Sequence, residues 1–245
     1  MLHQLARFTA IAPLIDELGG GRALDVGSGS EGVASWLRGD WAVTAVDRSF
    51  APIGAMRGPR ADRPVHTVVG DARELPFADG EFDVVLALDV MEHIEPAARG
   101  RALSELVRTA RRRVIVAGPA GDAALAADAG LAEGLRRRGL TPPGWLTEHE
   151  ANGFPAPGDL REQLAGHGRL RLLGNENLRW HEWLFRFEFR RPGRWASQRL
   201  SRAIAAGLAR GGPIGAAARA LARAAEGPSR PPHYRTIAVL DLERA

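Results

Sequence analysis

The chain has no cysteine and no lysine, and its single tyrosine is Tyr234. Without cysteine it can form no disulfide bond, thiolate zinc site or cysteine nucleophile. Without lysine it cannot contain the lysine of a phosphate-binding P-loop, a Schiff-base lysine or a lysine general base. These absences exclude disulfide-stapled scaffolds and lysine-based pyridoxal chemistry.

Long apolar runs are missing as well. No run approaches the roughly 18–20 residues that a membrane span needs, and residues 1–18 lack the basic region followed by an apolar one that marks a secretory signal. We therefore expect an uncleaved cytoplasmic protein. The 245 residues, 45% of them hydrophobic, suit one α/β domain or one domain with an appendage.

Positive charge is concentrated near the C-terminus. Residues 178–235 hold 12 arginines and 3 glutamates, a net charge of +9, and the remaining 21 arginines and 26 acids give −5. The high isoelectric point, near 10.8, is not evidence for nucleic-acid binding, because almost nothing titrates between histidine and arginine. The sequence therefore predicts an acidic body with a basic segment.

Short apolar runs alternate with helical patterns along most of the chain. Strands are predicted at 23–26, 42–46, 65–69, 82–88, 114–117, 170–173 and 236–242. Helices are predicted at 2–18, 31–38, 99–109, 123–138 and 159–165, and the proline- and glycine-bounded residues 141–158 are predicted to form a loop. The alternation implies right-handed βαβ units and a parallel sheet.

Amphipathic patterns continue in the basic segment. The side chains of a helical stripe are Trp180, Trp183, Leu184 and Phe187, although the alternation of Phe185, Phe187 and Phe189 fits a strand equally well, and we favour the helix. Residues 195–209 form a clearer helix, and a second helix is predicted to start at Pro213. The apolar face of the first of these two helices consists of Leu200, Ile204 and Leu208.

Three stretches in the first half of the chain carry the chemistry. They are LDVGSGSEG at 24–32, VTAVD at 43–47 and GDARELPFADGEFDVVLALDVMEHI at 70–94. Gly27 and Gly29 let the backbone turn sharply off a strand and approach a ligand closely. Asp47 ends the next strand, where a carboxylate can accept both ribose hydroxyl protons. All these strand ends lie at the carboxyl edge, where open α/β sheets bind ligands.

Together the three stretches resemble the class I S-adenosylmethionine-dependent methyltransferases, most of all their small-molecule branch of type 11. The resemblance covers roughly residues 22–118. It implies a Rossmann-like α/β fold: a seven-stranded, mostly parallel sheet, helices on both faces, an antiparallel last strand and a helical insertion before it. The expected division is a core with an N-terminal lid helix at 1–174, the basic helical insertion at 175–233 and the final strand at 234–245.

The resemblance also implies how the cofactor S-adenosyl-L-methionine would be bound. The glycine loop would pack against its methionine end, Asp71 would accept from the adenine amino group, and the backbone N–H of Ala72 would serve the ring. Two structural alternatives stay open: Asp47 as a solvated strand-end acid, and Asp71 as the cap of a helix. The implied cofactor-binding residues are Asp25, Gly27, Ser28, Gly29, Asp47, Arg48, Asp71, Ala72, Leu88 and Asp89.

The glycine spacing keeps other functions in view. The family often reads GxGxG, whereas Glu31 precedes Gly32 here and gives the GxGxxG of dinucleotide folds. An NAD(P)-dependent oxidoreductase is disfavoured, because a short-chain dehydrogenase uses a Tyr-x-x-x-Lys pair that a lysine-free chain lacks. A non-catalytic S-adenosylmethionine-binding or regulatory module stays open, and an RNA methyltransferase is less favoured.

Two histidines are the catalytic candidates. His93 follows the fourth strand, and His149 lies in the predicted loop. Methyl transfer is an in-line displacement that needs a base only for poorly nucleophilic acceptors, so a structural role for His93 and a lid or surface role for His149 stay open. Asp89, Glu92 and His93 could share a helix face, but the sequence offers no further ligands and no metal is expected.

The acceptor and the partners are less constrained. Methyl transfer to oxygen, nitrogen or carbon is possible, and a small-molecule, lipid-linked or glycan acceptor is favoured. The apolar stripes of the basic segment predict packing on the core or on a second copy of the chain, which would make a homodimer. Peripheral membrane contact through residues 178–225 is an alternative. Nucleic acid is disfavoured, because no recognised binding module is present.

Overall fold

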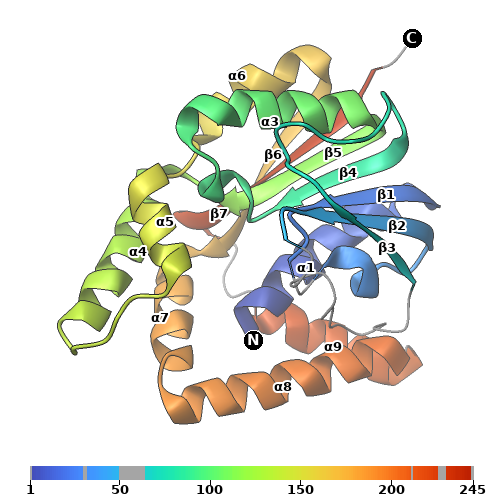
Figure 1. Ribbon diagram of the computed structural model, residues 1–245. Coiled ribbons are helices and arrows are strands. Elements are labelled where there is room, and N and C mark those ends of the chain that lie inside the picture. Colours follow the sequence, from blue (N-terminus) through green and yellow to red (C-terminus); the bar gives the residue numbers. More distant parts are fainter. Residues whose placement is uncertain (1, 30–31, 50–63, 211, 226–229, 244–245) are drawn as a thin grey trace.

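The computed structural model describes residues 2–29, 32–49, 64–210, 212–225 and 230–243, and a seven-stranded sheet runs through them (Figure 1). Its strand order is β3-β2-β1-β4-β5-β7-β6. β7 pairs antiparallel with both β5 and β6, and the other pairs are parallel, so the predicted mostly parallel sheet with a reversed last strand is confirmed. The strands are β1 (Gly20–Val26), β2 (Asp40–Asp47), β3 (Val65–Val69), β4 (Phe82–Leu88), β5 (Ala110–Pro119), β6 (Gly168–Asn177) and β7 (His233–Leu242).

Helices cover both faces of this sheet (Figure 1). α3 (Pro96–Thr109) and α6 (Pro157–Leu164) pack on one face, and α1 (Leu2–Asp16) packs on the other. Every residue of β4 is buried, as its unbroken apolar sequence predicts for a strand covered on both sides. The remaining helices are α4 (Gly121–Arg136), α5 (Gly144–Asn152), α7 (Leu178–Glu188), α8 (Arg191–Arg210) and α9 (Gly212–Ala225).

The helix predicted at 31–38 is wrong: the described part of that range holds only the short 3₁₀ turn η1 (Val33–Trp36). Asp16 explains why the helix does not continue. Its carboxylate accepts the backbone N–H groups of Arg38 and Gly39, and Leu37 is already extended. The chain is thus drawn straight into β2.

The loop predicted at 141–158 is also wrong, because residues 144–152 form α5. Pro143 precedes the first turn, and Gly153, at φ +62°, ends the helix. These two residues bracket α5 in the sequence, but its mixed composition gives no clear apolar periodicity. The correction moves His149 from a loop into a buried position on a helix.

The predicted helix in the first part of the basic segment is confirmed as α7, but of the predicted apolar stripe Leu184 is buried while Trp183 and Phe187 are exposed. His181, Leu184 and Glu188 face the core, whereas Trp183 is 54% exposed and Phe187 is 36% exposed. Glu188 accepts a hydrogen bond from the hydroxyl of Ser197, so its carboxylate is satisfied inside the protein. Two polar side chains at helical spacing therefore belong to the interior.

α8 and α9 form a helical pair that packs against α1. Ile204 is buried with Ala218 and Ala222, and Leu208 packs against this cluster. Leu200 is 45% exposed, so only part of the predicted apolar stripe is covered. None of the helices in the described ranges combines the length and the apolarity that crossing a bilayer requires.

The N-terminal helix is part of the core along most of its length. Phe8, Ile11 and Ile15 are buried against the sheet and η1. Arg7, one turn from the start, reaches Asp89 at the carboxyl end of β4 with 2.7 Å between Nη1 and Oδ2. A lid role for α1 stays a prediction.

Candidate functional site

A first cavity, of about 210 Å³, opens at the carboxyl ends of β1 to β4. Six of the ten residues expected to bind the cofactor line it: Gly27, Asp47, Arg48, Asp71, Ala72 and Asp89. The other four, Asp25, Ser28, Gly29 and Leu88, do not line it. The sheet topology thus brings together residues that are far apart in the sequence. Gly27 and Asp89, for example, are 62 positions apart.

The glycine loop after β1 depends on glycine at two positions. Gly27 has φ +66°, and a Cβ there would lie 2.6 Å from Cγ2 of Val90. Gly29 has φ +55° with open space where a Cβ would stand. The N–H of Gly29 donates to Oδ2 of Asp47 at 3.1 Å, so the loop and the tip of β2 are joined. Within the described part of the loop, Gly27 lines the cavity and can present only its backbone to it.

Asp25 supports this loop from behind. It is buried, and its Oδ2 accepts the backbone N–H of Val33 at 2.8 Å, which fixes the chain on the far side of the loop. Burial raises the pKa of Asp25 to about 6. Ser28 is also buried, and its Oγ has no hydrogen-bond partner among the residues that the structure describes.

Asp71 is not the cap of a helix, because residues 72–81 form turns and extended chain. Its Oδ1 accepts the backbone N–H of Arg73 at 2.8 Å, and its Oδ2 lies 2.7 Å from Nη2 of the same arginine. The hydrogen bonds from Arg73 lower the pKa of Asp71 to about 2. Asp71 is therefore an ionised carboxylate at the rim of the first cavity.

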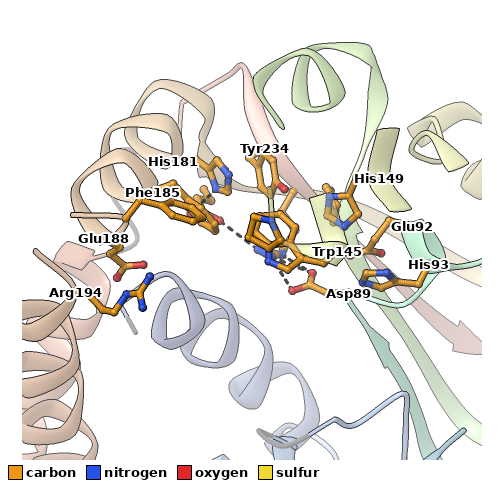
Figure 2. A pocket seen from close by; sticks show the side chains of 15 residues that line it. Asp89, Glu92, His93, Trp145, His149, His181, Phe185, Glu188, Arg194 and Tyr234 are labelled. Carbon is orange, nitrogen blue, oxygen red and sulfur yellow. Dashed lines mark hydrogen bonds and ion pairs between the residues drawn. The ribbon is translucent and has the colours of Figure 1, made fainter. Parts of the chain in front are cut away.

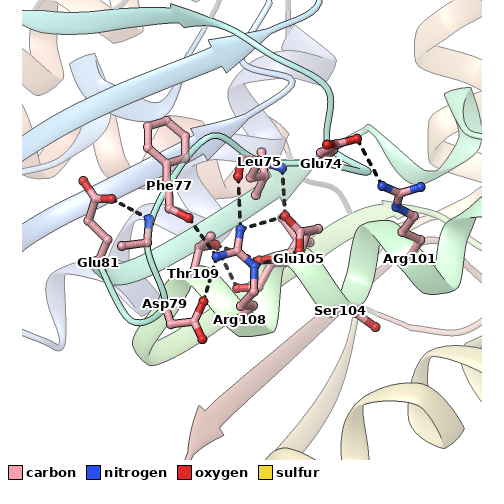
Figure 3. A network of polar contacts seen from close by, with 12 residues as sticks. Glu74, Leu75, Phe77, Asp79, Glu81, Arg101, Ser104, Glu105, Arg108 and Thr109 are labelled. Atoms are coloured by element: carbon pink, nitrogen blue, oxygen red, sulfur yellow. Dashed lines mark hydrogen bonds and ion pairs between the residues drawn. The ribbon is translucent and has the colours of Figure 1, made fainter.

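The segment that follows Asp71 is held by Arg108 of α3 (Figure 3). Arg108 donates to the backbone oxygens of Leu75 and Phe77 at 3.0 and 2.7 Å. Glu105 pairs with Arg108 and also accepts the N–H of Leu75 at 2.8 Å. This network fixes the chain beside the cavity without regular secondary structure.

A second cavity, of about 430 Å³, lies next to the first (Figure 2). Asp89 and His93 line both cavities. Aromatic side chains from α5, α7, β7 and the residue after α7 form much of its wall: Trp145, Phe185, Tyr234 and Phe189. The sequence did not reveal this cavity, because its lining comes from segments that only the fold brings together.

Two arginines bind Asp89 at the base of the second cavity. Arg235 lies 3.0 Å from Asp89 and 3.2 Å from the buried Glu176, and Arg7 approaches Asp89 from α1. Burial alone would lower the pKa of Arg235, but the carboxylates of Asp89 and Glu176 raise it. Asp89, at φ +54°, is therefore an ion-paired carboxylate held in an uncommon backbone conformation.

Asp128 of α4 organises a second group of buried side chains. Its Oδ2 lies 2.7 Å from Nδ1 of His149 and accepts the hydroxyl of Tyr234 at 3.0 Å. His181 lies 3.9 Å from Asp128 through Nε2 and 3.0 Å from Glu176 through Nδ1. Burial favours a lower pKa for His181, but the neighbouring carboxylates of Asp128 and Glu176 outweigh it and raise the pKa.

The two candidate catalytic histidines lie together, with ring centroids 5.2 Å apart (Figure 2). His93 is half-buried in η2 (Met91–His93), and its Nδ1 lies 2.6 Å from Glu148. Glu92 is buried beside them, and burial, reinforced by Asp89, raises its pKa well above the usual range. One ligand-type atom from each of Glu92, His93 and His149 lies within 4.8 Å of the others.

The comparisons with known proteins agree with this geometry. The family model described as a methyltransferase domain matches residues 24–117. Residues 24–117 are a methyltransferase domain. The expected family and fold are thereby confirmed, and the oxidoreductase interpretation finds no support in the match.

Similar curated proteins match less than half of the chain. A demethylmenaquinone methyltransferase of Beutenbergia cavernae is 37% identical over 108 residues, which is 42% of this chain and 44% of that protein. A ubiquinone biosynthesis O-methyltransferase of Azotobacter vinelandii is 40% identical over 102 residues, 37% of this chain and 41% of that protein. The chain thus spans less than half the length of these two relatives.

Similarity of fold extends further than similarity of sequence. A Thermotoga maritima structure described as a possible histamine N-methyltransferase superposes with a TM-score of 0.54 at 15% identity and covers 98% of this chain and 92% of its own. A Haemonchus contortus phosphoethanolamine N-methyltransferase in complex with S-adenosyl-L-methionine gives 0.53 at 17% identity, covering 95% of this chain and 52% of that one. These likenesses concern the fold.

The methyltransferase domain contains every residue of the first cavity but only part of the second. Residues 24–117 include the ends of β1 to β4, Glu92 and His93. The aromatic wall of the second cavity, His149 and Arg235 lie outside the matched span. The two cavities therefore differ in origin: the first lies wholly within the matched domain, whereas most of the lining of the second comes from the rest of the chain.

Proposed function

We propose that the chain transfers the methyl group of S-adenosyl-L-methionine, bound in the first cavity, to an acceptor held in the second. The observation that carries the proposal is the contact between the cavities, which share Asp89 and His93. A methyl donor in one and an acceptor in the other would meet at these residues. The cofactor supplies an electrophilic methyl group on a sulfonium sulfur.

The residues of the first cavity fit this cofactor. Next to the lining residue Gly27, Ser28 has a buried hydroxyl that finds no partner among the described residues, and a Cβ at Gly29 would meet nothing within 4 Å. Asp47 keeps acceptor capacity after binding the N–H groups of Gly29 and Ser49, since each carboxylate oxygen can accept two hydrogen bonds. The Asp47 carboxylate could also face a cationic ligand, whereas Asp71 and Asp89 are already paired with arginines.

We infer that the acceptor is a small molecule with a hydroxylated aromatic ring, methylated on oxygen. The second cavity has aromatic walls for a planar ring and polar side chains at its base. The names of two similar proteins, a demethylmenaquinone methyltransferase and a ubiquinone biosynthesis O-methyltransferase, indicate quinone precursors as acceptors. A tocopherol O-methyltransferase of Arabidopsis thaliana is 28% identical over 116 residues.

His93 is the side chain best placed to contact such an acceptor. It lines both cavities, and Glu148 occupies its Nδ1, which leaves Nε2 for a hydroxyl group. His149 also lines the second cavity, but it is buried and anchored by Asp128. We therefore assign contact with the acceptor to His93 and support of the cavity wall to His149.

A lipid surface is a second proposed partner. Trp183 and Phe187 of α7 stack on each other with ring centroids 5.6 Å apart and face outward. Trp195 of α8 is 61% exposed and carries Arg199 over its ring. Exposed aromatic side chains beside arginines are typical of peripheral membrane contacts. Such a contact would bring a lipid-tailed acceptor to the second cavity.

The test is binding followed by turnover. Calorimetry should show one S-adenosylhomocysteine bound per chain, and label from methyl-labelled cofactor should enter hydroxylated aromatic acceptors. Catechol-like and quinol-like compounds are compared with matched O-methylated compounds that lack a free hydroxyl. No binding would refute the proposal. Binding without transfer into small-molecule, lipid or RNA pools would favour the non-catalytic module.

A further inference from the structure

Three side chains with metal-ligand chemistry converge where the two cavities meet (Figure 2). Glu92 and His93 come from η2, directly after β4, and His149 comes from α5. Each offers one ligand atom, and these atoms all lie within 4.8 Å of one another. The sequence pointed to no metal because it supplied only the first part of this set.

Two of the three side chains carry buried atoms that nothing satisfies. Glu92 is 1% exposed and His149 is 4% exposed. Oε2 of Glu92 and Nε2 of His149 find no hydrogen-bond partner within the part of the chain that the structure describes. Buried polar atoms are normally paired, because an unpaired one destabilises the fold. One bound cation would satisfy both.

Both histidines are oriented as metal ligands are. Nδ1 of His93 lies 2.6 Å from Glu148, and Nδ1 of His149 lies 2.7 Å from Asp128. A neutral histidine whose Nδ1–H donates to a carboxylate has its free lone pair on Nε2. Metal-binding histidines almost always make such an outer hydrogen bond, which fixes the tautomer and the ring.

The two supporting segments are tied together independently of any ligand. Arg99 donates from Nε to the backbone oxygens of Met91 and Ile94, and from Nη2 to those of Asn152 and Gly153. The side chain of Asn152 in turn donates to the backbone oxygen of Glu92 at 3.1 Å. The end of α5 is therefore fixed against η2, which places His149 opposite Glu92.

The neighbouring strand also leaves room for the Glu92 carboxylate. A Cβ at Gly118 of β5 would lie 3.0 Å from Oε2 of Glu92. Glycine at this position lets the carboxylate lie against the backbone of β5. The site is thus shaped from three sides: η2, α5 and β5.

We propose that Glu92, His93 and His149 bind one divalent transition-metal ion of the Zn²⁺ type, with its open coordination positions facing the second cavity. Two nitrogens and one carboxylate oxygen suit such an ion, whereas Mg²⁺ and Ca²⁺ prefer all-oxygen sites. Bonds of about 2.0–2.2 Å bring ligand atoms closer to one another than the 4.8 Å limit within which these three lie. His93 is more exposed than Glu92 and His149, so we expect it to make the adjustment.

This inference deepens the proposed function and rests on it for its chemical role. An acceptor hydroxyl in the second cavity could take an open position on the ion, beside the first cavity that His93 also lines. A bound metal ion lowers the pKa of a coordinated hydroxyl. His93 would then bind the ion through Nε2 instead of accepting a proton. A measurement of the metal bound per chain distinguishes these two roles.

The test measures metal binding by the full chain, after removal of bound metal with a chelator. Titration with Zn²⁺ should show one equivalent bound with a dissociation constant in the micromolar range or below, and Mg²⁺ should not compete. Co²⁺, used as a spectroscopic probe, should give visible absorption bands that Zn²⁺ abolishes. Glu92→Gln and His93→Ala should each weaken Zn²⁺ binding at least tenfold.

Matched controls identify the site. His66→Ala and His167→Ala remove exposed histidines outside the cluster and should leave Zn²⁺ binding unchanged. Glu148→Gln removes only the carboxylate behind His93 and should weaken binding by about tenfold. His93 and Glu148 are not core residues, so we expect their variants to fold. Thermal melting of His93→Ala and Glu148→Gln checks this.

The outcomes separate this inference from the proposed function. If the chain binds no stoichiometric Zn²⁺, or if Glu92→Gln and His93→Ala bind it like the parent chain, the metal site is refuted. S-adenosylhomocysteine binding, measured in the same samples, tests the proposed function on its own. Metal binding without cofactor binding would leave the site standing and remove its catalytic role.

Discussion

The Asp47 carboxylate offers the sharpest test of the cofactor site. It lies at the end of β2, lines the first cavity and holds the glycine loop through the N–H of Gly29 at 3.1 Å. Asp47→Ala removes this bond and the proposed hydrogen bonds to the ribose. Hydrogen bonds to a charged group contribute about 1.5–3 kcal/mol. We therefore expect S-adenosylhomocysteine to bind roughly 10- to 150-fold more weakly.

Isothermal calorimetry measures this loss, and β2 itself supplies the control. Asp40 begins the same strand, at the opposite edge of the sheet, and its side chain is exposed. Asp40→Ala should leave the affinity unchanged. An Asp47→Ala variant that melts like the parent chain and binds S-adenosylhomocysteine equally tightly would refute the ribose assignment. Asp47→Asn, which keeps one acceptor oxygen, should lie between the two.

Three further predictions concern other parts of the molecule. His93→Ala should lower turnover by about 10²-fold with little change in S-adenosylhomocysteine affinity, and normal turnover would make His93 structural. Burial raises the pKa of Asp25 from 3.8 to about 6, so the folded state holds its proton more tightly than the unfolded chain. Protonated Asp25 therefore stabilises the folded state by up to about 3 kcal/mol. This stabilisation is fully present below pH 3.8 and is lost as the pH rises through about 6. Asp25→Asn should therefore flatten the pH dependence of denaturant unfolding over this window, and an unchanged slope would contradict the assignment. The chain should sediment with anionic vesicles at low salt but not with neutral vesicles. High salt, or the double substitution Trp183→Ser/Trp195→Ser, should reduce the sedimented fraction. Failure to sediment with either kind of vesicle would exclude the membrane contact.

The sheet and the first cavity were predictable because their signals are local. Continuous apolar runs mark buried parallel strands, and glycines or acids directly after those runs mark the carboxyl edge. Gly27, Asp47 and Asp71 each follow their own strand, so the topology of one sheet suffices to bring them together. No knowledge of side-chain packing was needed.

The second cavity and the proposed metal site depend on packing between distant segments. α5 lacks a clear apolar periodicity, and its position against η2 is fixed by backbone contacts of Arg99. His181 and Glu188 look like surface residues of an amphipathic helix, yet inside the protein Glu176 pairs with Nδ1 of His181 and Ser197 donates to Glu188. His181 and Glu176 are 5 residues apart in the sequence, and Glu188 and Ser197 are 9 apart. Neither spacing forms a pattern that distinguishes these buried pairs from solvated side chains.

The different origins of the two cavities lead to a final prediction, which concerns the acceptor. Phe185 of α7 lines the second cavity, stacks on His181 at 4.4 Å between ring centroids and lies outside the matched methyltransferase domain. Loss of an aromatic wall removes about 1.5–3 kcal/mol of apolar contact, so Phe185→Ala should raise the KM for a hydroxylated aromatic acceptor roughly 10- to 150-fold.

The same substitution should leave S-adenosylhomocysteine affinity unchanged, because Phe185 does not line the first cavity. Phe187→Ala is the matched control: it removes an identical side chain two positions along the same helix, where the ring faces outward. If Phe185→Ala weakened cofactor binding as much as acceptor binding, the two cavities would not be separate sites. If Phe187→Ala raised the KM for a water-soluble acceptor equally, the aromatic wall would not be what recognises the ring, and the acceptor would have to bind elsewhere on the chain.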